Sequence, residues 1–277
     1  MARLCRGHES MAAGESALAI LRPLGPTVEL AWAYANLASR FMVVDEHAAA
    51  IEMAHQAQSI AEPLELLDVL SDALNTEGCV AATTGQEWTQ PLSRALDIAL
   101  TARLDEQAGR AYANFHATYC EQRRFAEGDR YFVDGIAHCQ EHEIHTFATC
   151  LQGERAGMLE KSGRWDEAVA VLTELLDQAT ASPGNRLCAL MRLGIIRARR
   201  AEPNVWGCLD EAAELADGTG EPQVIVPVRL ARAEAFWLED KHSSAERELE
   251  FAATASAAPT RHAAAAEARR LGLVGAA

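Results

Sequence analysis

Small or slender residues recur along this chain at a nearly constant interval. They are Ala38, Gly78, His116, Ala156, Gly194 and Ala235, separated by 40, 38, 40, 38 and 41 residues. Each lies in an apolar, helix-forming stretch that is followed by a turn and a second such stretch. Helices that pack closely need small side chains where they cross, and a period of this length is typical of an α-solenoid. We therefore expect an all-α, tetratricopeptide-like solenoid: a right-handed superhelix of about six antiparallel helix pairs around one concave groove.

The rest of the sequence divides around these positions. The six expected pairs span residues 27–66, 67–106, 107–145, 146–185, 186–222 and 223–259. Residues 1–26 form a partial leading repeat, in which a helix from Ser16 to Leu24 is closed by Pro23 and Pro26, because proline cannot continue the helical hydrogen bonds. Residues 260–277 are rich in arginine and alanine and are expected to form a capping helix. The prediction is one repeat domain over residues 1–277.

The charge balance argues against a surface for nucleic acid. Acidic residues outnumber Lys and Arg by 40 to 25, for a net charge of −15, and there is no basic tail to neutralise phosphates. No apolar run approaches the roughly 18 residues of a membrane helix, and the first residues lack the pattern of a secretory signal. We expect a cytoplasmic chain that binds neither nucleic acid nor membrane. Its seven scattered cysteines are expected to be reduced and structural.

The residues in these stretches carry a resemblance to a known repeat. The first pair, with Tyr34, Ala38 and Pro63 at the matching phases, resembles a tetratricopeptide repeat, and GRWDEAVAVL at 163–172 resembles its turn and second helix. The segments LRPLGPTVELAWAYANLASRFMVVDEHAAAIEMAHQAQSIAE, GRAYANFHATYCEQRRFAEGDRYF and LGIIRARRAEPNVWGCLDEAAELA are similar to the helical array of large actinobacterial LuxR-type regulators. Such regulators carry an ATPase module before the array and a DNA-binding helix-turn-helix after it. This chain has no G-x-x-x-x-G-K-[ST] motif and no basic helix-turn-helix, so the resemblance implies the array alone.

Repeat arrays of this kind bind partners along the face lined by their first helices. In that phase lie Trp32, Asn36, Arg110, Asn114 and Arg192. Asn36 and Asn114 occupy the same phase of repeats one and three, and Arg110 lies one turn before Asn114. Such a set can hold a peptide carboxylate through charge-assisted hydrogen bonds. The alternative, which we weigh more heavily, is that asparagine caps local backbone groups and arginine covers apolar neighbours.

Two histidine groups raise the question of metal or nucleophilic chemistry. On one continuous helix, His138, His142 and His145 would share a face and offer a zinc site. The repeat phase ends that helix near Glu141, so we expect the shared face to be lost and no metal to be bound. His116 and Cys120 form an i, i+4 pair that can activate a thiolate, but interior packing is the favoured interpretation. We expect no catalytic residues and no cofactor.

The expected function is therefore recognition rather than catalysis. The resemblance implies an interaction or effector-sensing scaffold, similar to the sensor array of LuxR-type regulators. Its expected partner is a protein or peptide, with a small-molecule effector or a second copy of the chain as further options. Two alternatives stay open: a stand-alone adaptor that binds an acidic peptide, and an enzyme that uses the histidine and cysteine groups.

Overall fold

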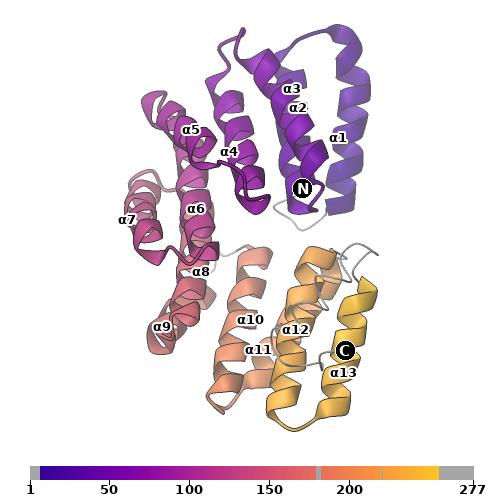
Figure 1. Ribbon diagram of the computed structural model, residues 1–277, viewed down its shortest axis with the longest axis vertical. Helices are drawn as coiled ribbons and strands as arrows, with labels where there is room; N and C mark the ends of the chain where they lie inside the picture. Colours follow the sequence, from indigo (N-terminus) through magenta and orange to yellow (C-terminus); the bar gives the residue numbers. More distant parts are fainter. Residues whose placement is uncertain (1–6, 179–181, 220, 256–277) are drawn as a thin grey trace. The chain divides into compact units, whose positions relative to one another are not determined.

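The chain folds into helices throughout the part that the structure describes. The computed structural model describes residues 7–178, 182–219 and 221–255, and over these ranges the secondary structure consists of thirteen α-helices and one 3-10 turn, without a strand (Figure 1). The all-α helical-repeat prediction is confirmed. The expected capping helix at 260–277 lies outside the described residues. None of the described helices is long and apolar enough to cross a membrane.

The helices follow one another as the period predicts. A single helix, α1 (Gly7–Leu21), and a short turn, η2 (Arg22–Leu24), precede six pairs. The pairs are α2 (Val28–Val43) with α3 (His47–Ala61), α4 (Leu67–Thr83) with α5 (Thr89–Thr101), α6 (Asp105–Glu121) with α7 (Phe125–Glu141), α8 (His145–Lys161) with α9 (Trp165–Asp177), α10 (Pro183–Arg199) with α11 (Val205–Thr219), and α12 (Pro222–Leu238) with α13 (His242–Ala255).

The leading helix differs from the sequence prediction. It begins at Gly7 rather than Ser16 and ends at Leu21, and Pro23 falls in the 3-10 turn that follows. Gly14 lies inside the helix without breaking it, because there the helix packs closely on α2: a Cβ at Gly14 would lie 2.6 Å from a methyl carbon of Leu37. Tertiary packing thus outweighs the low helix propensity of glycine.

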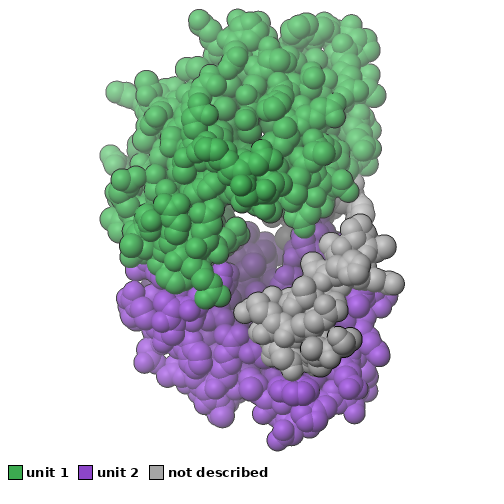
Figure 2. All heavy atoms as spheres, in the orientation of Figure 1, with its two compact units in different colours: residues 1–2, 6–154 green, residues 3–5, 155–277 purple. Residues whose placement is uncertain are grey.

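Contacts group the described helices into two compact units (Figure 2). One ends at Glu154, the other begins at Arg155, and the boundary falls inside α8. In the first unit the first helices α2, α4 and α6 contact one another in order, and the second helices α3 and α5 each pack on the next first helix. In the second unit α10 contacts α12, and α9 and α11 fill the corresponding second-helix positions. Most of these helices therefore pack mainly on their neighbours in sequence, as in repeat proteins.

The periodic small residues are buried, and two of them lie where paired helices cross. All six are buried, and Ala38, His116 and Ala156 have no exposed surface. A Cβ on Gly78 would lie 2.6 Å from Cγ of Leu92 on α5, and one on Gly194 would lie 2.6 Å from Cδ2 of Leu209 on α11. The expectation that close helix approach sets this period is confirmed at these two crossings.

One loop conformation joins most of the helices. It places one residue of the loop in the left-handed region, at Asp45, Glu65, Gly85, Arg103, Arg123, Glu143, Gly163, Ala201 and Asp240. The next residue donates its N–H back to the last turn of the preceding helix, as Arg124 does to the Tyr119 carbonyl at 2.9 Å. This is the Schellman ending, which satisfies carbonyls that a helix end leaves open. Because the loop is short, successive helices are held side by side.

Candidate partner-binding surface on the first helices

The five residues predicted from the sequence do not form a single group. Trp32 is half-buried and packs against the core of the first unit. Asn36 is exposed, and its side-chain amide donates to the Trp32 carbonyl at 2.8 Å, within its own helix α2. For Asn36 the structure therefore shows the local backbone contact that the sequence analysis gave as the alternative. Arg110 and Asn114 lie on α6, and Arg192 belongs to the second unit.

Arg110 links three consecutive first helices. Its Nη1 lies 2.6 Å from Oδ1 of Asp72 on α4 in an ion pair whose side chains are 14% and 18% exposed. The guanidinium also donates to the Asp72 carbonyl at 3.3 Å, to Oγ1 of Thr76 at 3.0 Å and to Oγ of Ser39 on α2 at 3.4 Å. Because Asp72 balances the charge, Arg110 holds α6 to α4 and α2 before any ligand is present.

Asn114 contacts an asparagine that the sequence analysis did not single out. Its Nδ2 donates to Oδ1 of Asn75 on α4, and the Cys79 thiol lies 3.7 Å from the same oxygen. Asn75 is only 1% exposed, and its Nδ2 has no hydrogen-bond partner among the described residues. Asn75 lies 39 residues before Asn114 and 39 after Asn36, so the three asparagines hold one phase of three successive repeats. That equal spacing is the sequence signal that could have identified Asn75.

Arg192 takes part in a separate row of charges. Its Nη1 lies 3.3 Å from Oε2 of Glu160 on α8, and its guanidinium packs where a Cβ on Gly157 would otherwise lie. The same Glu160 accepts from Arg199 on α10 at 2.9 Å, and Arg199 also pairs with Glu234 on α12 at 2.7 Å. In the second unit, too, ion pairs join consecutive first helices.

The candidate catalytic pair on α6, His116 and Cys120, is buried. His116 has no exposed surface and its Nδ1 lies 3.0 Å from the Gly128 carbonyl on α7, while Cys120 is 2% exposed with its sulfur 3.7 Å from both ring nitrogens. A nucleophile must touch its substrate, so this burial favours packing between α6 and α7. Burial likewise raises the pKa of the Cys139 thiol to about 11, which keeps the thiol neutral at physiological pH.

The histidines near residue 140 are arranged differently from the sequence interpretation. Helix α7 does end at Glu141, and His145 begins α8. Nevertheless the rings of His138 and His142 stay together, with centroids 4.5 Å apart, so the expectation that their shared face is lost is wrong for this pair. His142 directly follows the last residue of α7 and so stays beside His138, and only His145 is separated.

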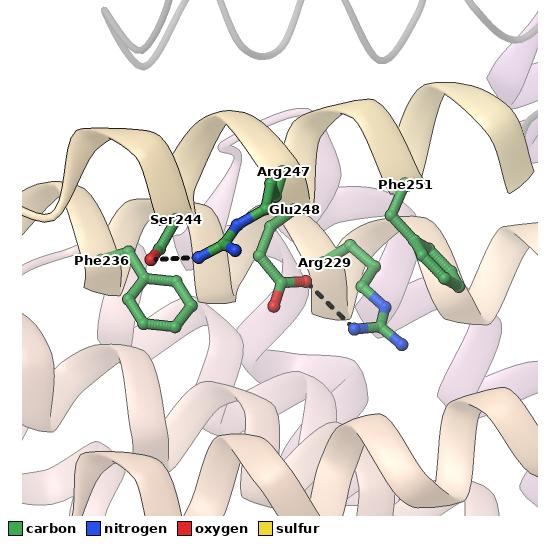
Figure 3. A pocket seen from close by; sticks show the side chains of 6 residues that line it. All are labelled: Arg229, Phe236, Ser244, Arg247, Glu248 and Phe251. Carbon is green, nitrogen blue, oxygen red and sulfur yellow. Dashed lines mark hydrogen bonds and ion pairs between the residues drawn. The ribbon is translucent and has the colours of Figure 1, made fainter.

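A pocket of about 280 Å³ lies between α12 and α13 (Figure 3). Its lining comprises Arg229, Phe236, Ser244, Arg247, Glu248 and Phe251. Glu248 accepts from Arg229 at 3.1 Å and from Arg232 at 2.8 Å, and the Arg229 guanidinium lies 4.0 Å over the Phe251 ring. These groups satisfy one another, so the pocket is best explained as the packed seam of the last described hairpin.

Comparisons with known proteins add no family to this description. No protein-family model matches the chain, and no curated protein matches it. The candidate surface therefore rests on the geometry of α2, α4 and α6 alone.

Proposed function

We propose that the chain is a cytoplasmic helical-repeat scaffold that recognises a peptide segment or a small effector on the first helices of its first unit. The candidate surface comprises Asn36, Asn75, Arg110 and Asn114, with Asp72 as the partner of Arg110. The observation that carries the proposal is the buried Nδ2 of Asn75, which has no hydrogen-bond partner among the described residues, on an asparagine that stands in register with two others.

A buried donor without a partner is costly. Native proteins pair nearly all such groups, and one left open costs about 1–3 kcal/mol. A ligand that binds the half-buried Asn114 and turns its amide would bring the Asn114 oxygen to Asn75 Nδ2, and so recover that energy without touching Asn75 itself. An asparagine amide offers one donor group and one acceptor, which matches a peptide backbone. A row of asparagines across successive helices therefore favours an extended chain.

The charges of this chain argue against the acidic peptide that was one of the alternatives from the sequence. Arg110 already faces Asp72 at 2.6 Å, so an anionic group must displace an internal carboxylate before it can use the guanidinium. The net charge of −15 further opposes an acidic partner. We therefore favour neutral amide-bearing ligands. Ligand binding would shift the first helices and thereby change the self-association of the chain. Such a response fits the resemblance to a sensor array.

Peptide display on the full chain tests this proposal. A library of random linear peptides is panned against the immobilised protein, and the affinity of a selected peptide is measured by calorimetry. We expect Asn114→Ala and Asn75→Ala each to weaken binding by at least about tenfold, since each removes a hydrogen bond worth roughly 1 kcal/mol or more from a desolvated site.

The matched control is Gln140→Ala, which removes an amide from an exposed position on the second helix α7. Its affinity should equal that of the parent. Circular dichroism confirms that each variant is folded. Folded asparagine variants that bind with parental affinity, or a panning that yields no binder, would overturn the proposal.

A further inference from the structure

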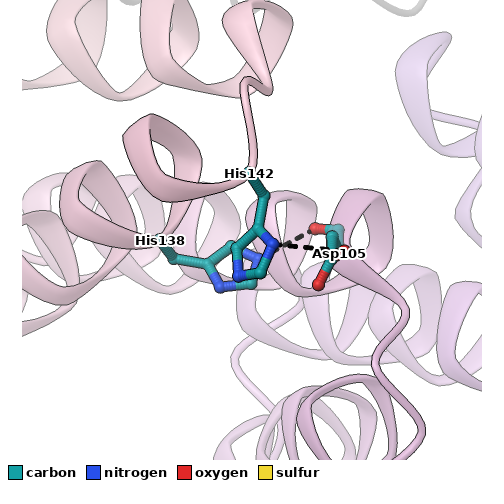
Figure 4. A group of neighbouring side chains, drawn as sticks. All are labelled: Asp105, His138 and His142. Atoms are coloured by element: carbon teal, nitrogen blue, oxygen red, sulfur yellow. Dashed lines mark hydrogen bonds and ion pairs between the residues drawn. The ribbon is translucent and has the colours of Figure 1, made fainter.

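Three metal-ligating side chains converge at the open end of the α6–α7 hairpin (Figure 4). They are Asp105, the first residue of α6, with His138 in the last turn of α7 and His142 directly after it. One carboxylate oxygen and one nitrogen from each imidazole all lie within 4.8 Å of one another. His142 Nδ1 is 3.3 Å from Oδ2 of Asp105, and His138 Nε2 is 3.1 Å from the Asp105 main-chain carbonyl.

We propose that Asp105, His138 and His142 bind a divalent transition-metal ion of the zinc class. Imidazole nitrogen with one carboxylate oxygen is a donor set that suits Zn²⁺, whereas Mg²⁺ and Ca²⁺ prefer oxygen alone. Three protein ligands leave the fourth tetrahedral position for water or a group from another molecule. The proposal stands independently of the function proposed above.

The ligands need little movement to close on an ion. Bonds of about 2.1 Å in a tetrahedron place ligand atoms roughly 3.4 Å apart, compared with the present limit of 4.8 Å. His142 and Asp105 have side chains 35% and 40% exposed, so both can rotate. His138 is less mobile, because its ring lies against Tyr112 with centroids 5.8 Å apart. One fixed and two adjustable ligands allow the site to close.

The arrangement also shows why the spacing of the three histidines did not predict this cluster. The i, i+4 pair His138 and His142 remains, but its third ligand comes from the start of the preceding helix and not from His145. A metal ion there would join the beginning of α6 to the end of α7. The simplest rival is an ion pair between His142 and Asp105 that has no role in metal binding.

Zinc titration of the full chain separates these two cases. The protein is prepared without a polyhistidine tag, treated with a chelator and titrated calorimetrically with ZnCl₂ and, separately, MgCl₂. We expect one saturable Zn²⁺ site, no Mg²⁺ binding, and a rise in melting temperature with Zn²⁺. His142→Ala and Asp105→Asn should each weaken the Zn²⁺ affinity at least about tenfold and remove the shift in melting temperature.

His145→Ala is the matched control, because His145 is exposed, lies three residues beyond His142 and is not part of the cluster. It should bind Zn²⁺ as the parent does. Melting in the presence of chelator checks that His142→Ala, a change at an exposed residue, is folded. No saturable Zn²⁺ binding, unchanged affinity in His142→Ala, or an equal loss in His145→Ala would each overturn the proposal.

Discussion

His116 stands where five other repeats carry alanine or glycine, and its neighbour on α7 explains how it fits. In repeats one and four the residue twelve positions later is Ala50 or Ala168, whereas in repeat three it is Gly128. The glycine lets α7 approach this part of α6 closely: a Cβ on Gly128 would lie 3.1 Å from Cβ of Tyr119 and 3.4 Å from His116 Nδ1, which is also 3.0 Å from the Gly128 carbonyl. In repeat three, the large side chain of His116 is thus matched by a glycine, Gly128, on the facing helix.

Gly78→Ala is expected to destabilise the chain by about 1–3 kcal/mol. Its new Cβ would lie 2.6 Å from Cγ and 3.1 Å from the backbone nitrogen of Leu92, so α4 and α5 must move apart. The matched change is Gly153→Ala on α8, where no atom lies within 4 Å and the better helix propensity should stabilise by up to about 1 kcal/mol. Urea unfolding measures both. Equal midpoints for the two variants would contradict the close crossing.

Besides apolar packing, two kinds of interaction join the helices of this fold: the hydrogen bonds of the Schellman loops, and ion pairs. Non-glycine residues such as Arg123 and Ala201 adopt the left-handed conformation in the loops, and the Schellman bonds that follow offset the strain. Ion pairs then connect successive helices. Glu248 on α13, 9% exposed, accepts from Arg229 and Arg232 on α12, which reach in turn to Asp217 and Asp210 on α11.

Glu248→Gln should lower the free energy of unfolding by about 2 kcal/mol. The change leaves two arginines, each only 12–13% exposed, without the carboxylate that they share. The control is Glu167→Gln, which breaks an exposed pair with Arg164 and should leave the urea midpoint unchanged. If both variants melt like the parent, the shared carboxylate does not stabilise the α12–α13 hairpin.

At the scale of the whole molecule, several arginines form ion pairs between neighbouring helices of the fold. Arg110, Arg192, Arg199, Arg229 and Arg232 each face at least one carboxylate of a neighbouring helix. The net charge of the whole chain is strongly negative, at −15. Arginines that are already paired within the fold are poorly placed to neutralise phosphates, and the net field repels a polyanion.

A labelled DNA duplex should therefore show no change in fluorescence anisotropy when titrated with this chain, even at low salt, where electrostatic attraction is strongest. A basic DNA-binding protein serves as the positive control for the assay. Saturable binding whose affinity falls steeply as salt rises would contradict the prediction and would require a concentrated cationic surface.

Local sequence was sufficient to predict the six helix pairs, although not the bounds of the leading helix. The interval of about 40 residues, the i, i+3, i+4 apolar spacing and the helix-breaking prolines act within one helix or one hairpin, so the six pairs and the all-α class follow from them. The left-handed conformation was predictable where glycine supplies it, as at Gly163, whereas at Arg123 or Glu143 nothing in the residue type indicates it.

Side-chain partners were decided by the tertiary structure. The pairing of Arg110 with Asp72, 38 residues away, depends on how α6 crosses α4, and the same is true of Asn114 with Asn75. Asp105 meets His138 and His142 only because a Schellman loop folds α7 back along α6. Periodicity along one chain fixes which face of a helix is buried, whereas the angle and offset between two helices fix which polar atoms on those faces come within reach of each other.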